Sequence, residues 1–476
     1  MGIFDALTTA VSGLGAQSYS LQNISGNIAN STTTGFKRVE TSFVDLIPST
    51  PSATQLAGSV NARSRNTTTL QGSISQTGIA TNIALNGDGF FVVQSRTGFA
   101  GGQPSFSGID QYTRRGDFQL DNSGNLVNGA GNYLEGIAVD PITGALQGSK
   151  PAVLKISTKD LPALQTSNVS YQANLPPVPS TAASQVPSAP VSASRIWGGG
   201  LSQLNAVGQV VSGIVETAFI NTTVDGGAKT LYAPNGSPVN MQIRWGEVSP
   251  NTWQAFYRID SSAAPVAGTP RWQQFGGTAA GGNGVVGGNI TFNAAGTNTT
   301  AAASQVTSLS GVVIDGVQVD SAGLPVLFDM SGGLTQFSGS TSSGSAAGQV
   351  GGINVTANGY TAGSFQSLSL DTGGRLVGNY TNGQIVPLAQ ISEAKFKNSD
   401  GMVRVSGGTF QQTLDSGQPV VLSAGSELSG GAVEQSNVDI AAEFSKMIVT
   451  QQAYSSNAKV ITTANTMLGE ILAVIR

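Results

Sequence analysis

Apolar residues recur at alternating steps of three and four at the two ends of the chain, and about 400 residues with a strand-like pattern separate these two stretches. Thin stripes of this kind predict helices that pair with other helices, because a lone helix with a narrow stripe buries too little area to be stable. We expect both helices to become ordered on assembly. The N-terminal seam consists of Ile3, Leu7, Ala10, Leu14, Gln17, Leu21, Ile24 and Ile28. The C-terminal seam consists of Ile440, Phe444, Met447, Gln451, Tyr454, Ala458, Ile461, Asn465, Leu468, Leu472 and Ile475.

The two predicted helices are attached to the same β-rich body, so they should run antiparallel if they pair. With Ile28 level with Ile440, Gln17 and Gln451 lie eleven residues further along and would meet across the seam. Polar residues at such positions fix the register of a coiled coil. The C-terminal helix would extend about ten residues past its partner, so we expect 467–476 to contact the next subunit. In the competing interpretation, each helix packs on the β-domain of its own chain.

Between the seams the pattern changes to the period of two that is typical of strands, with turn residues expected at 86–89, 121–124, 249–251 and 315–316. The segment Leu120–Val127 is echoed by Leu370–Val377, in which Leu, Asp, Gly, Leu and Val keep their spacing. Either two independent hairpins share common turn residues, or both flanks build one β-domain into which the middle is inserted. Prolines between 176 and 190 favour a boundary there.

The expected fold is mainly β with terminal α-helices. The helices would form an antiparallel, coiled-coil-like inner domain, and the β-domains would be built from paired flanks with a nested insertion. The expected parts are the N-terminal helix in 1–35, an extended, irregular connector in 36–75, the first part of a β-domain in 76–175, an inserted outer β-domain (one or two) in 176–357, the second part of the β-domain in 358–434, and the C-terminal helix in 435–476.

The amino-acid composition excludes several classes of catalytic and metal-binding site. The chain has no histidine and no cysteine, which excludes Ser-His-Asp triads, thiol nucleophiles and Cys/His zinc sites. Charged residues are only 10% and the net charge is −4, without a basic patch for nucleic acid. Carboxylate catalysis stays possible, but nothing marks any acidic residue as catalytic. We expect a protein that is not an enzyme and binds no cofactor, metal or nucleic acid.

Three local patterns have simpler explanations than ligand binding. The glycines at 282, 284 and 287 match a dinucleotide fingerprint by chance, since no strand–helix context surrounds them. The turns at 86–89 and 121–125 lack the glutamate that closes a calcium loop, which favours hairpin turns. The aromatic cluster of Trp245, Trp253, Phe256 and Tyr257 could line a sugar groove, although a β-core is the better interpretation.

The first residues do not read as a secretory signal peptide, because no basic segment precedes a continuous apolar one. Polar residues such as Ser12, Gln17 and Asn23 also interrupt any membrane span. The chain is therefore expected to stay inside the cell or to leave it by a route without a cleaved signal, and no membrane insertion is expected.

Motifs at both ends resemble the axial proteins of the bacterial flagellum, and among them most closely the hook proteins. The main motif is the run 27–38, with Asn27, Ala29, Asn30, Gly35, Phe36 and Lys37, followed by Thr41-Ser-Phe-Val-Asp45. The helix 6–28 matches as well. Further matches are Leu85-Asn-Gly-Asp-Gly89-Phe-Phe, Tyr112-Thr-Arg-Arg-Gly116-Asp-Phe, Glu443-Phe-Ser-Lys-Met-Ile, Gln451-Gln-Ala-Tyr454 and Asn457-Ala-Lys-Val-Ile. These segments are specific to the axial family, whereas 176–357 shows no detailed resemblance.

The resemblance implies a structural subunit that self-assembles into a short, curved, flexible helical tube and transmits torque from rod to filament. It implies terminal helices that line a central export channel, with β-domains outside. The implied partners are other copies of the chain, the distal rod protein, the hook cap, the hook–filament junction proteins and the flagellar type III export apparatus. The implied location is extracellular, in the flagellar hook, after export without cleavage. The alternatives are a distal rod protein and a secreted β-rich adhesin or carbohydrate-binding protein.

Overall fold

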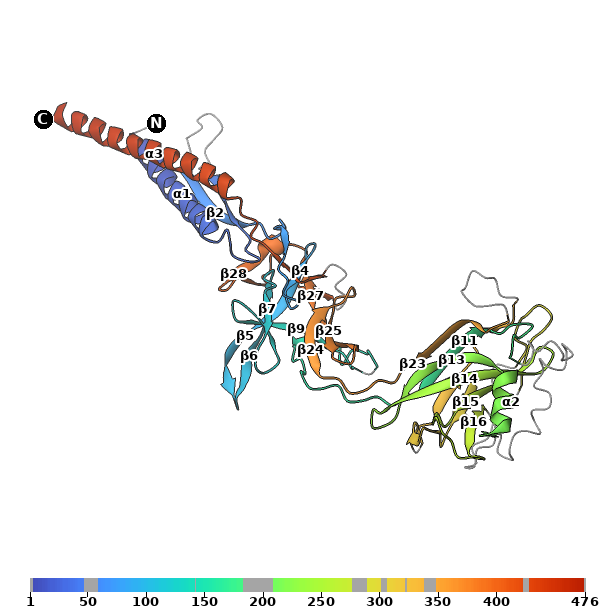
Figure 1. Ribbon diagram of the computed structural model, residues 1–476. Coiled ribbons are helices and arrows are strands. Elements are labelled where there is room, and N and C mark those ends of the chain that lie inside the picture. The colour runs from blue at the N-terminus through green and yellow to red at the C-terminus, as the bar shows by residue number, and fades with distance from the viewer. Residues whose placement is uncertain are drawn as a thin grey trace. The chain divides into compact units, whose positions relative to one another are not determined.

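A computed structural model describes residues 3–46, 59–141, 143–182, 209–275, 289–300, 306–321, 323–337, 348–422 and 428–474. Within these ranges the chain is mainly β with three α-helices (Figure 1), and it divides into two compact units. Unit 1 contains both ends of the chain and consists of Met1–Lys159, Phe365–Tyr380 and Ile385–Arg476. Unit 2 consists of Asp160–Ser364 and Thr381–Gln384.

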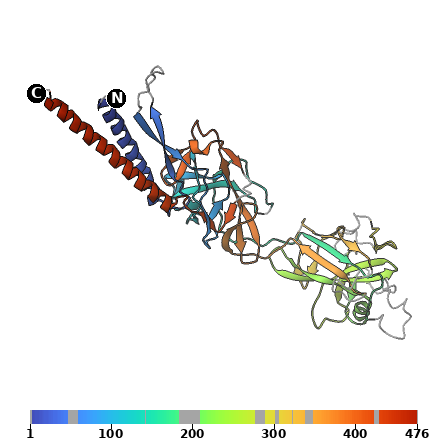
Figure 2. The same ribbon diagram turned by 90° about the horizontal axis from the view of Figure 1, so that it is seen from above.

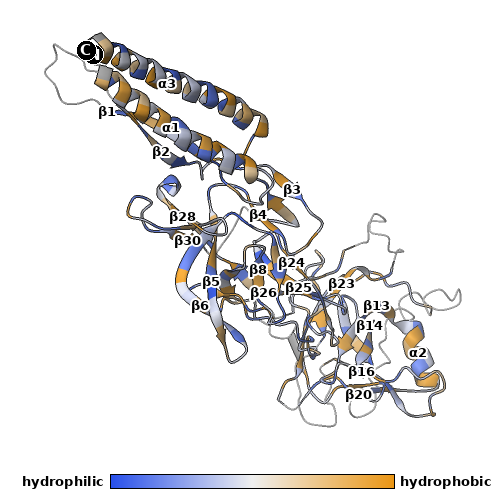
Figure 3. Ribbon diagram, turned by 90° about the vertical axis from the view of Figure 1, so that its left-hand side faces the viewer, coloured by the Kyte–Doolittle hydropathy of each residue, from blue (hydrophilic) through white to orange (hydrophobic). Residues whose placement is uncertain are grey.

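The two long helices of unit 1 are the terminal ones, α1 (Ile3–Ala29) and α3 (Ile440–Val474). They lie side by side in both views (Figures 1 and 2). Helix α3 begins at a carboxylate cap, because Asp439 Oδ1 accepts the backbone N–H of Ala441 at 2.9 Å and that of Ala442 at 3.1 Å. Hydrophobic residues lie along both helices (Figure 3).

The segment predicted to be an irregular connector is instead a regular antiparallel hairpin. Strand β1 (Val39–Leu46) pairs with β2 (Ser59–Asn66) from Val39↔Asn66 to Leu46↔Ser59. The prediction was wrong because neither strand alternates between buried and exposed residues: both lie mostly at the surface, so packing does not impose a period of two.

The β-domain of unit 1 is organised around one large, mostly antiparallel sheet with a hydrophobic cluster on each face. Alternation along β5 shows this directly, because Phe91 and Val93 enter one cluster while Phe90 and Val92 enter the other. The strands of this sheet are β5 (Phe90–Ala100), β6 (Gln103–Thr113), β7 (Phe118–Leu120), β8 (Leu126–Asn128), β9 (Asn132–Ala138), β10 (Ala152–Val153), β24 (Phe365–Leu370), β25 (Arg375–Tyr380), β26 (Ile385–Ile391), β27 (Glu393–Lys395), β28 (Val403–Val405), β29 (Thr409–Gln411) and β30 (Val420–Leu422).

Two short ladders connect the beginning of this domain to its end. Strand β3 (Ile74–Gln76) pairs with β32 (Ala432–Glu434), and β4 (Ile83–Leu85) pairs with β31 (Leu428–Gly430). The predicted strand–turn–strand at 83–93 therefore has its strands, but they pair with other segments and not with each other. A 3-10 turn, η5 (Ser399–Gly401), precedes β28.

The echoed octapeptides form the same turn twice in the same sheet. Asp121 Oδ1 accepts the N–H groups of Ser123 and Asn125, and Asp371 Oδ1 accepts those of Gly373 and Arg375, each at 2.8 Å. The final glycine of each turn has a positive φ, 86° at Gly124 and 74° at Gly374. The flanking leucines of both copies contribute to one hydrophobic cluster, Leu120, Leu126, Leu370 and Leu376.

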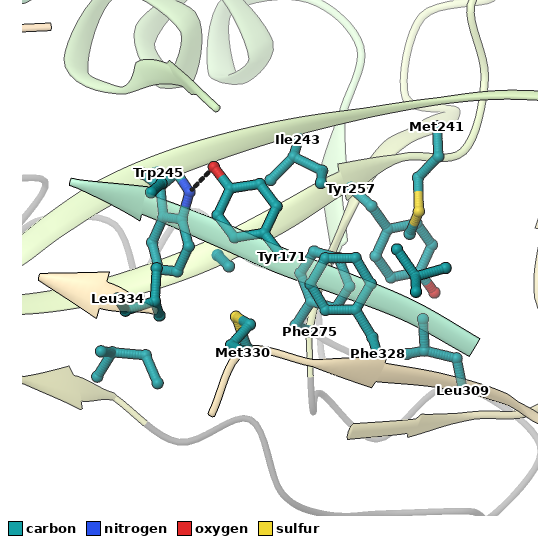
Figure 4. Close-up of a cluster of buried hydrophobic side chains, with 14 of the residues drawn as sticks. Tyr171, Met241, Ile243, Trp245, Tyr257, Phe275, Leu309, Phe328, Met330 and Leu334 are labelled. Atoms are coloured by element: carbon teal, nitrogen blue, oxygen red, sulfur yellow. Dashed lines mark hydrogen bonds between the residues drawn. The ribbon is translucent and has the colours of Figure 1, made fainter. Parts of the chain in front are cut away.

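Unit 2 contains two larger sheets, and side chains of both form one aromatic-rich cluster (Figure 4). The first sheet consists of β11 (Asn168–Asn174), β18 (Val306–Leu309), β21 (Val326–Asp329), β22 (Leu334–Thr335) and β23 (Gly351–Ala357). The second consists of β12 (Gln209–Val211), β13 (Val224–Tyr232), β14 (Pro238–Ser249), β15 (Thr252–Arg258), β16 (Pro270–Gln274) and β17 (Ile290–Thr291). The helix α2 (Ile214–Thr222) places Phe219 against Phe256 and Trp272 in a second cluster.

The boundaries of unit 2 differ from the expected 176–357. The unit begins at Asp160, because the two segments that enter and leave it pair through Leu161↔Gly363 and Leu164↔Tyr360. The prolines from 176 therefore follow the first strand of unit 2 and do not precede the unit. The described turns are as predicted: β14 and β15 form one hairpin, and β19 (Val313–Ile314) and β20 (Val317–Gln318) form another.

Candidate assembly site: the paired terminal helices and their buried anchor

Helices α1 and α3 contact each other through small and polar side chains. Two pairs of neighbouring residues define the register of the helices. Asn27 Nδ2 donates a hydrogen bond to Glu443 Oε2 at 2.9 Å. Gly13 lies against Asn457, so close that a Cβ added to Gly13 would be 2.8 Å from Asn457 Nδ2. From the first pair to the second, the residue number falls by fourteen on α1, from 27 to 13, and rises by fourteen on α3, from 443 to 457. The two helices are therefore antiparallel. The buried residues of the two helices are Ala10, Gly13, Ala16, Ser20, Ile24 and Asn27 on α1, and Glu443, Thr450 and Ala464 on α3.

This register is displaced by two residues from the predicted one. Gln17 is level with Ala453, so Gln451 lies two residues, about half a turn, from the level at which it was expected to meet Gln17. Gln451 is exposed, and within the described part of the chain no hydrogen bond joins it to Gln17. The displacement arises because the predicted register was counted on bulky residues, whereas small residues let two helices approach most closely.

The seam residues flank the contact and are only partly covered. Of the predicted set only Ile24 and Ala10 are buried, and the side chains of Ile3 and Ile475 lie outside the described residues. Those that are partly buried are Leu7, Leu14, Gln17, Leu21 and Ile28 on α1, and Met447, Ala458, Ile461 and Leu468 on α3. Those that are exposed are Ile440, Phe444, Gln451, Tyr454, Asn465 and Leu472.

A second face of α1 binds the β1–β2 hairpin through polar residues that the sequence analysis missed. Ser12 Oγ accepts the backbone N–H of Val60 at 3.0 Å, and Asn23 Nδ2 donates to Thr41 Oγ1 at 2.9 Å. Tyr19 Oη and Ser64 Oγ are 2.7 Å apart. The steps from Ser12 to Tyr19 to Asn23 are seven and four, so a polar stripe with the same spacing as the apolar seam was the available signal.

Asn27 of the family motif joins α1, β1 and α3. It is buried, its Nδ2 donates to Val39 O at 2.9 Å as well as to Glu443, and its Oδ1 accepts the N–H of Val39 at 2.9 Å. The amide thus pairs with the first backbone unit of the hairpin as another strand would. An acid or an aliphatic residue could not supply this combination of donor and acceptor.

Lys37 belongs to a buried ionic cluster that attaches the chain ends to the β-domain. Glu434 Oε1 accepts from Lys37 Nζ at 2.6 Å, and Glu434 Oε2 accepts from Arg114 Nη1 at 3.3 Å. All three side chains are almost fully buried. We call Lys37, Arg114 and Glu434 the buried anchor.

Further hydrogen bonds support the buried anchor. Lys37 Nζ also donates to Leu70 O at 2.6 Å, Arg114 Nη2 donates to Gly87 O, and Glu434 Oε1 accepts the N–H of Gly72 at 2.8 Å. Burial lowers the pKa of Lys37 and of Arg114, while attraction to Glu434 acts in the opposite direction on both. Removal of one charge would leave the others buried without compensation.

The rest of the motif shapes the turn between α1 and β1. Gly35 has φ 66°, its N–H donates to Glu434 O at 2.8 Å, and a Cβ there would lie 2.7 Å from the backbone of Arg114. No other residue fits this position without displacing the chain. The guanidinium of Arg404 lies 4.6 Å from the ring centre of Phe36. Asn30 Nδ2 donates to Gly26 O at 2.9 Å, while Ala29 is exposed.

The remaining candidate residues either have structural roles or lie outside the described residues. Trp245, Trp253, Phe256 and Tyr257 are buried, so the β-core interpretation is confirmed over a sugar groove. In Figure 4, Trp245 Nε1 donates to Tyr171 Oη at 2.9 Å inside the core. Glycines 282, 284 and 287 lie outside the described ranges. No described helix is long and apolar enough to cross a bilayer.

Comparisons with known proteins match two separate segments of the chain with family descriptions and the whole chain with individual relatives. The family description "Flagellar hook protein FlgE/F/G D1 domain" matches residues 84–170, and "Flagellar basal body rod FlgEFG protein C-terminal" matches residues 429–474. The flagellar hook protein FlgE of Escherichia coli is 28% identical over 98% of this chain and 99% of its own. Those of Salmonella typhimurium and Treponema pallidum are 29% and 28% identical, over 98% and 99% of this chain.

A solved structure of the flagellar hook protein FlgE2 of Helicobacter pylori has a TM-score of 0.47 at 14% identity, over 76% of this chain and 99% of that one. The anchored pair of terminal helices and the two family matches define an axial protein of the flagellar rod–hook class. Within that class, the chain is similar over its full length to flagellar hook proteins.

Proposed function

We propose that this chain, a structural subunit of the flagellar hook, self-assembles into a curved helical tube through its terminal helices. The helices would form a coiled-coil-like inner layer around the export channel, and the β-domains would lie outside it. The tube would bend as it turns and transmit torque from rod to filament. Export through the type III apparatus without cleavage would bring the subunit to the hook, where the distal rod protein, the hook cap and the junction proteins are its proposed partners.

The observation that carries this proposal is the set of large apolar side chains left exposed along both helices. Contiguous exposed apolar surface is unfavourable in a monomer and is typical of a protein interface. On α1 these residues are Phe4, Val11 and Tyr19; on α3 they are Ile440, Phe444, Ile448, Val449, Tyr454, Val460, Met467, Ile471 and Leu472. Since the buried anchor fixes where both helices leave the β-domain, this surface is presented in a defined direction.

Low charge supports the proposed bending. Only 10% of the residues are charged, and the chain holds 63 glycines. Contacts between such surfaces contain few ion pairs that would select one arrangement, so neighbouring subunits can slide with little cost. Inner helices with continuous apolar faces would keep the tube intact while the outer contacts change.

The test is electron microscopy of the purified chain after salting-out. Wild type is expected to form curved tubes, and Ile448→Asp is expected to prevent them, because it places a charge on the exposed apolar face of α3. Val266→Asp is the matched control: Val266 is even more exposed, but it belongs to unit 2. Normal tubes from Ile448→Asp and from Phe444→Asp would refute the proposal, and straight polymers from wild type would refute the proposed curvature.

A further inference from the structure

A groove of about 560 Å³ opens between α1, α3 and the β1–β2 hairpin. Its apolar lining comes from all three elements: Ile24 on α1, Val39 and Phe43 on β1, and Val449 on α3. Lys446 lies at its edge with 46% of its side chain exposed. Phe43 and Val449 also remain exposed, so the groove contains apolar surface that no described part of the chain covers.

The far end of α3 carries a second uncovered apolar surface. In the observed register Ile3 is level with Met467, so the part of α3 from 468 to 474 has no partner on α1. Figures 1 and 2 show α3 continuing past the start of α1. We call residues 467–474 the overhang. Met467, Ile471 and Leu472 on it are exposed, with 67% of Leu472 accessible.

We propose that the overhang of one copy of this chain docks in the groove of a second copy. The inference rests on the proposed function and names the contact that would propagate the polymer. Two different surfaces of one chain that fit each other produce a head-to-tail contact, and such a contact continues as an open helix unless it closes into a ring. An overhang that found its partner on the same chain would end assembly instead.

Geometry excludes docking within one chain. Val449 in the groove and Ile471 on the overhang belong to the same continuous helix and are 22 residues apart, about 33 Å at 1.5 Å per residue. The partner must therefore be another molecule. Because both surfaces lie on α3, every copy in the polymer offers one groove and one overhang, so one type of contact serves all subunits.

Charge supports the same pairing. Glu470 on the overhang is exposed and has no ion pair among the described residues. Lys446 at the groove is bonded to Glu443 Oε1 at 2.9 Å, but nearly half of its side chain stays open to a second acid. Glu470→Lys should therefore raise the concentration needed for polymerisation about three-fold, and Glu470→Gln should raise it less, as expected for a partly exposed ion pair.

The decisive experiment uses the absence of cysteine from the chain. The double variant Val449→Cys, Ile471→Cys is polymerised, oxidised and separated under denaturing, non-reducing conditions. Since a disulfide needs Cα atoms about 4.4–6.8 Å apart, the two thiols of one chain cannot join. The proposal predicts a ladder of dimers, trimers and longer linked chains from the polymer, none from unpolymerised protein, and no ladder beyond dimers from either single variant.

The matched control is Phe444→Cys, Ile471→Cys, because Phe444 is exposed on α3 but does not line the groove. An equal ladder from this control would overturn the inference. A polymer of normal shape that gives no ladder, with Val449→Cys or with Phe43→Cys as the groove thiol, would also overturn it and would leave the proposed function standing. Failure of wild type to form tubes under the electron microscope would instead count against the proposed function.

Discussion

Unit 2 and the terminal helices differ in how far their large apolar side chains are buried. In unit 2 the largest side chains, such as Trp245 and Trp253, are fully buried between two sheets of the same chain. On the helices, Phe444 is half exposed and Leu472 is 67% exposed, while the residues buried on α1 are mostly small or polar, such as Ala10, Gly13 and Ser20. The core of unit 2 is thus buried within one chain, whereas large apolar side chains along the helices stay exposed.

The difference has an energetic consequence. Full burial of one large apolar side chain stabilises a fold by roughly 1.5–3 kcal/mol, so unit 2 has ample stabilisation of its own. The small residues between α1 and α3 bury little apolar area. The hydrogen bond between Asn27 and Glu443 fixes the register of the two helices but adds little to their stability. In the proposed polymer the helices would therefore be held by the buried anchor at one end and stabilised along their length by assembly.

The largest predicted effect is on the buried anchor. Glu434→Ala leaves Lys37 and Arg114 buried without a counter-charge, and we expect unit 1 to lose about 3–5 kcal/mol of unfolding free energy. All four tryptophans of the chain, Trp197 included, lie in the sequence of unit 2. Urea unfolding followed by helical circular dichroism should therefore shift, while tryptophan fluorescence should not.

Glu40→Ala is the control for this variant, because its ion pair with Arg38 is partly exposed and should be worth under about 1 kcal/mol. If Glu434→Ala shifted both signals together, the two units would unfold as one, and the contrast between them would be wrong.

A smaller effect concerns Glu135, which is buried on β9 with Oε1 unbonded. Its pKa is raised to about 7, mainly by burial and also by Asp110 on β6, while Gln94 on β5 and Lys150 act in the opposite direction. The folded state holds this proton more tightly than the unfolded state, so unit 1 should lose stability as pH rises from about 4.5 to 7, by up to about 3 kcal/mol.

Glu135→Gln should remove that pH dependence, since an amide does not titrate. Tyr112, whose pKa is raised to about 12 by burial, stays neutral over this range. Unfolding curves at pH 5 and pH 8 provide the measurement. Equal slopes with pH in wild type and Glu135→Gln would show that another group is responsible, and unit 2 fluorescence should be unaffected in both.

The smallest predicted effect tests how closely the helices approach. A side chain at Gly13 meets the end of Asn457, whereas one at Gly15 meets nothing within 4 Å. Gly13→Leu should cost about 1–3 kcal/mol of helix pairing through overpacking, and Gly15→Leu should be neutral or slightly stabilising through better helix propensity. Helical circular dichroism on heating distinguishes them, and equal melting curves would mean that the contact is looser than described.

Sequence patterns were sufficient wherever local chemistry decides the structure. The terminal helices, the Asp-Gly turn at Asp315 and the repeated turns after Leu120 and Leu370 are all local features. Long-range pairing was not predictable in the same way. Strands β4 and β5 were found, but the partner of β4 is more than 300 residues away, and no single-sequence pattern specifies that register.

For the site, the seams located the correct helices but not the correct face. Heptad counting weights bulky side chains, while the observed contact depends on Gly13, Ser20 and other small residues that carry no hydrophobic signal. The motif drew attention to Lys37, yet its partners Arg114 and Glu434 lie far along the chain, so the buried anchor appears only in three dimensions.

Amide hydrogen exchange before and after polymerisation tests the central claim most directly, because it reports the local stability of each segment. In the monomer, α1 and α3 should exchange faster than strands β14 and β15 of unit 2, which should be protected. Polymerisation should slow exchange strongly along both helices and leave β14 and β15 unchanged. Helices that are already as protected as unit 2 in the monomer, with no gain on assembly, would contradict the account.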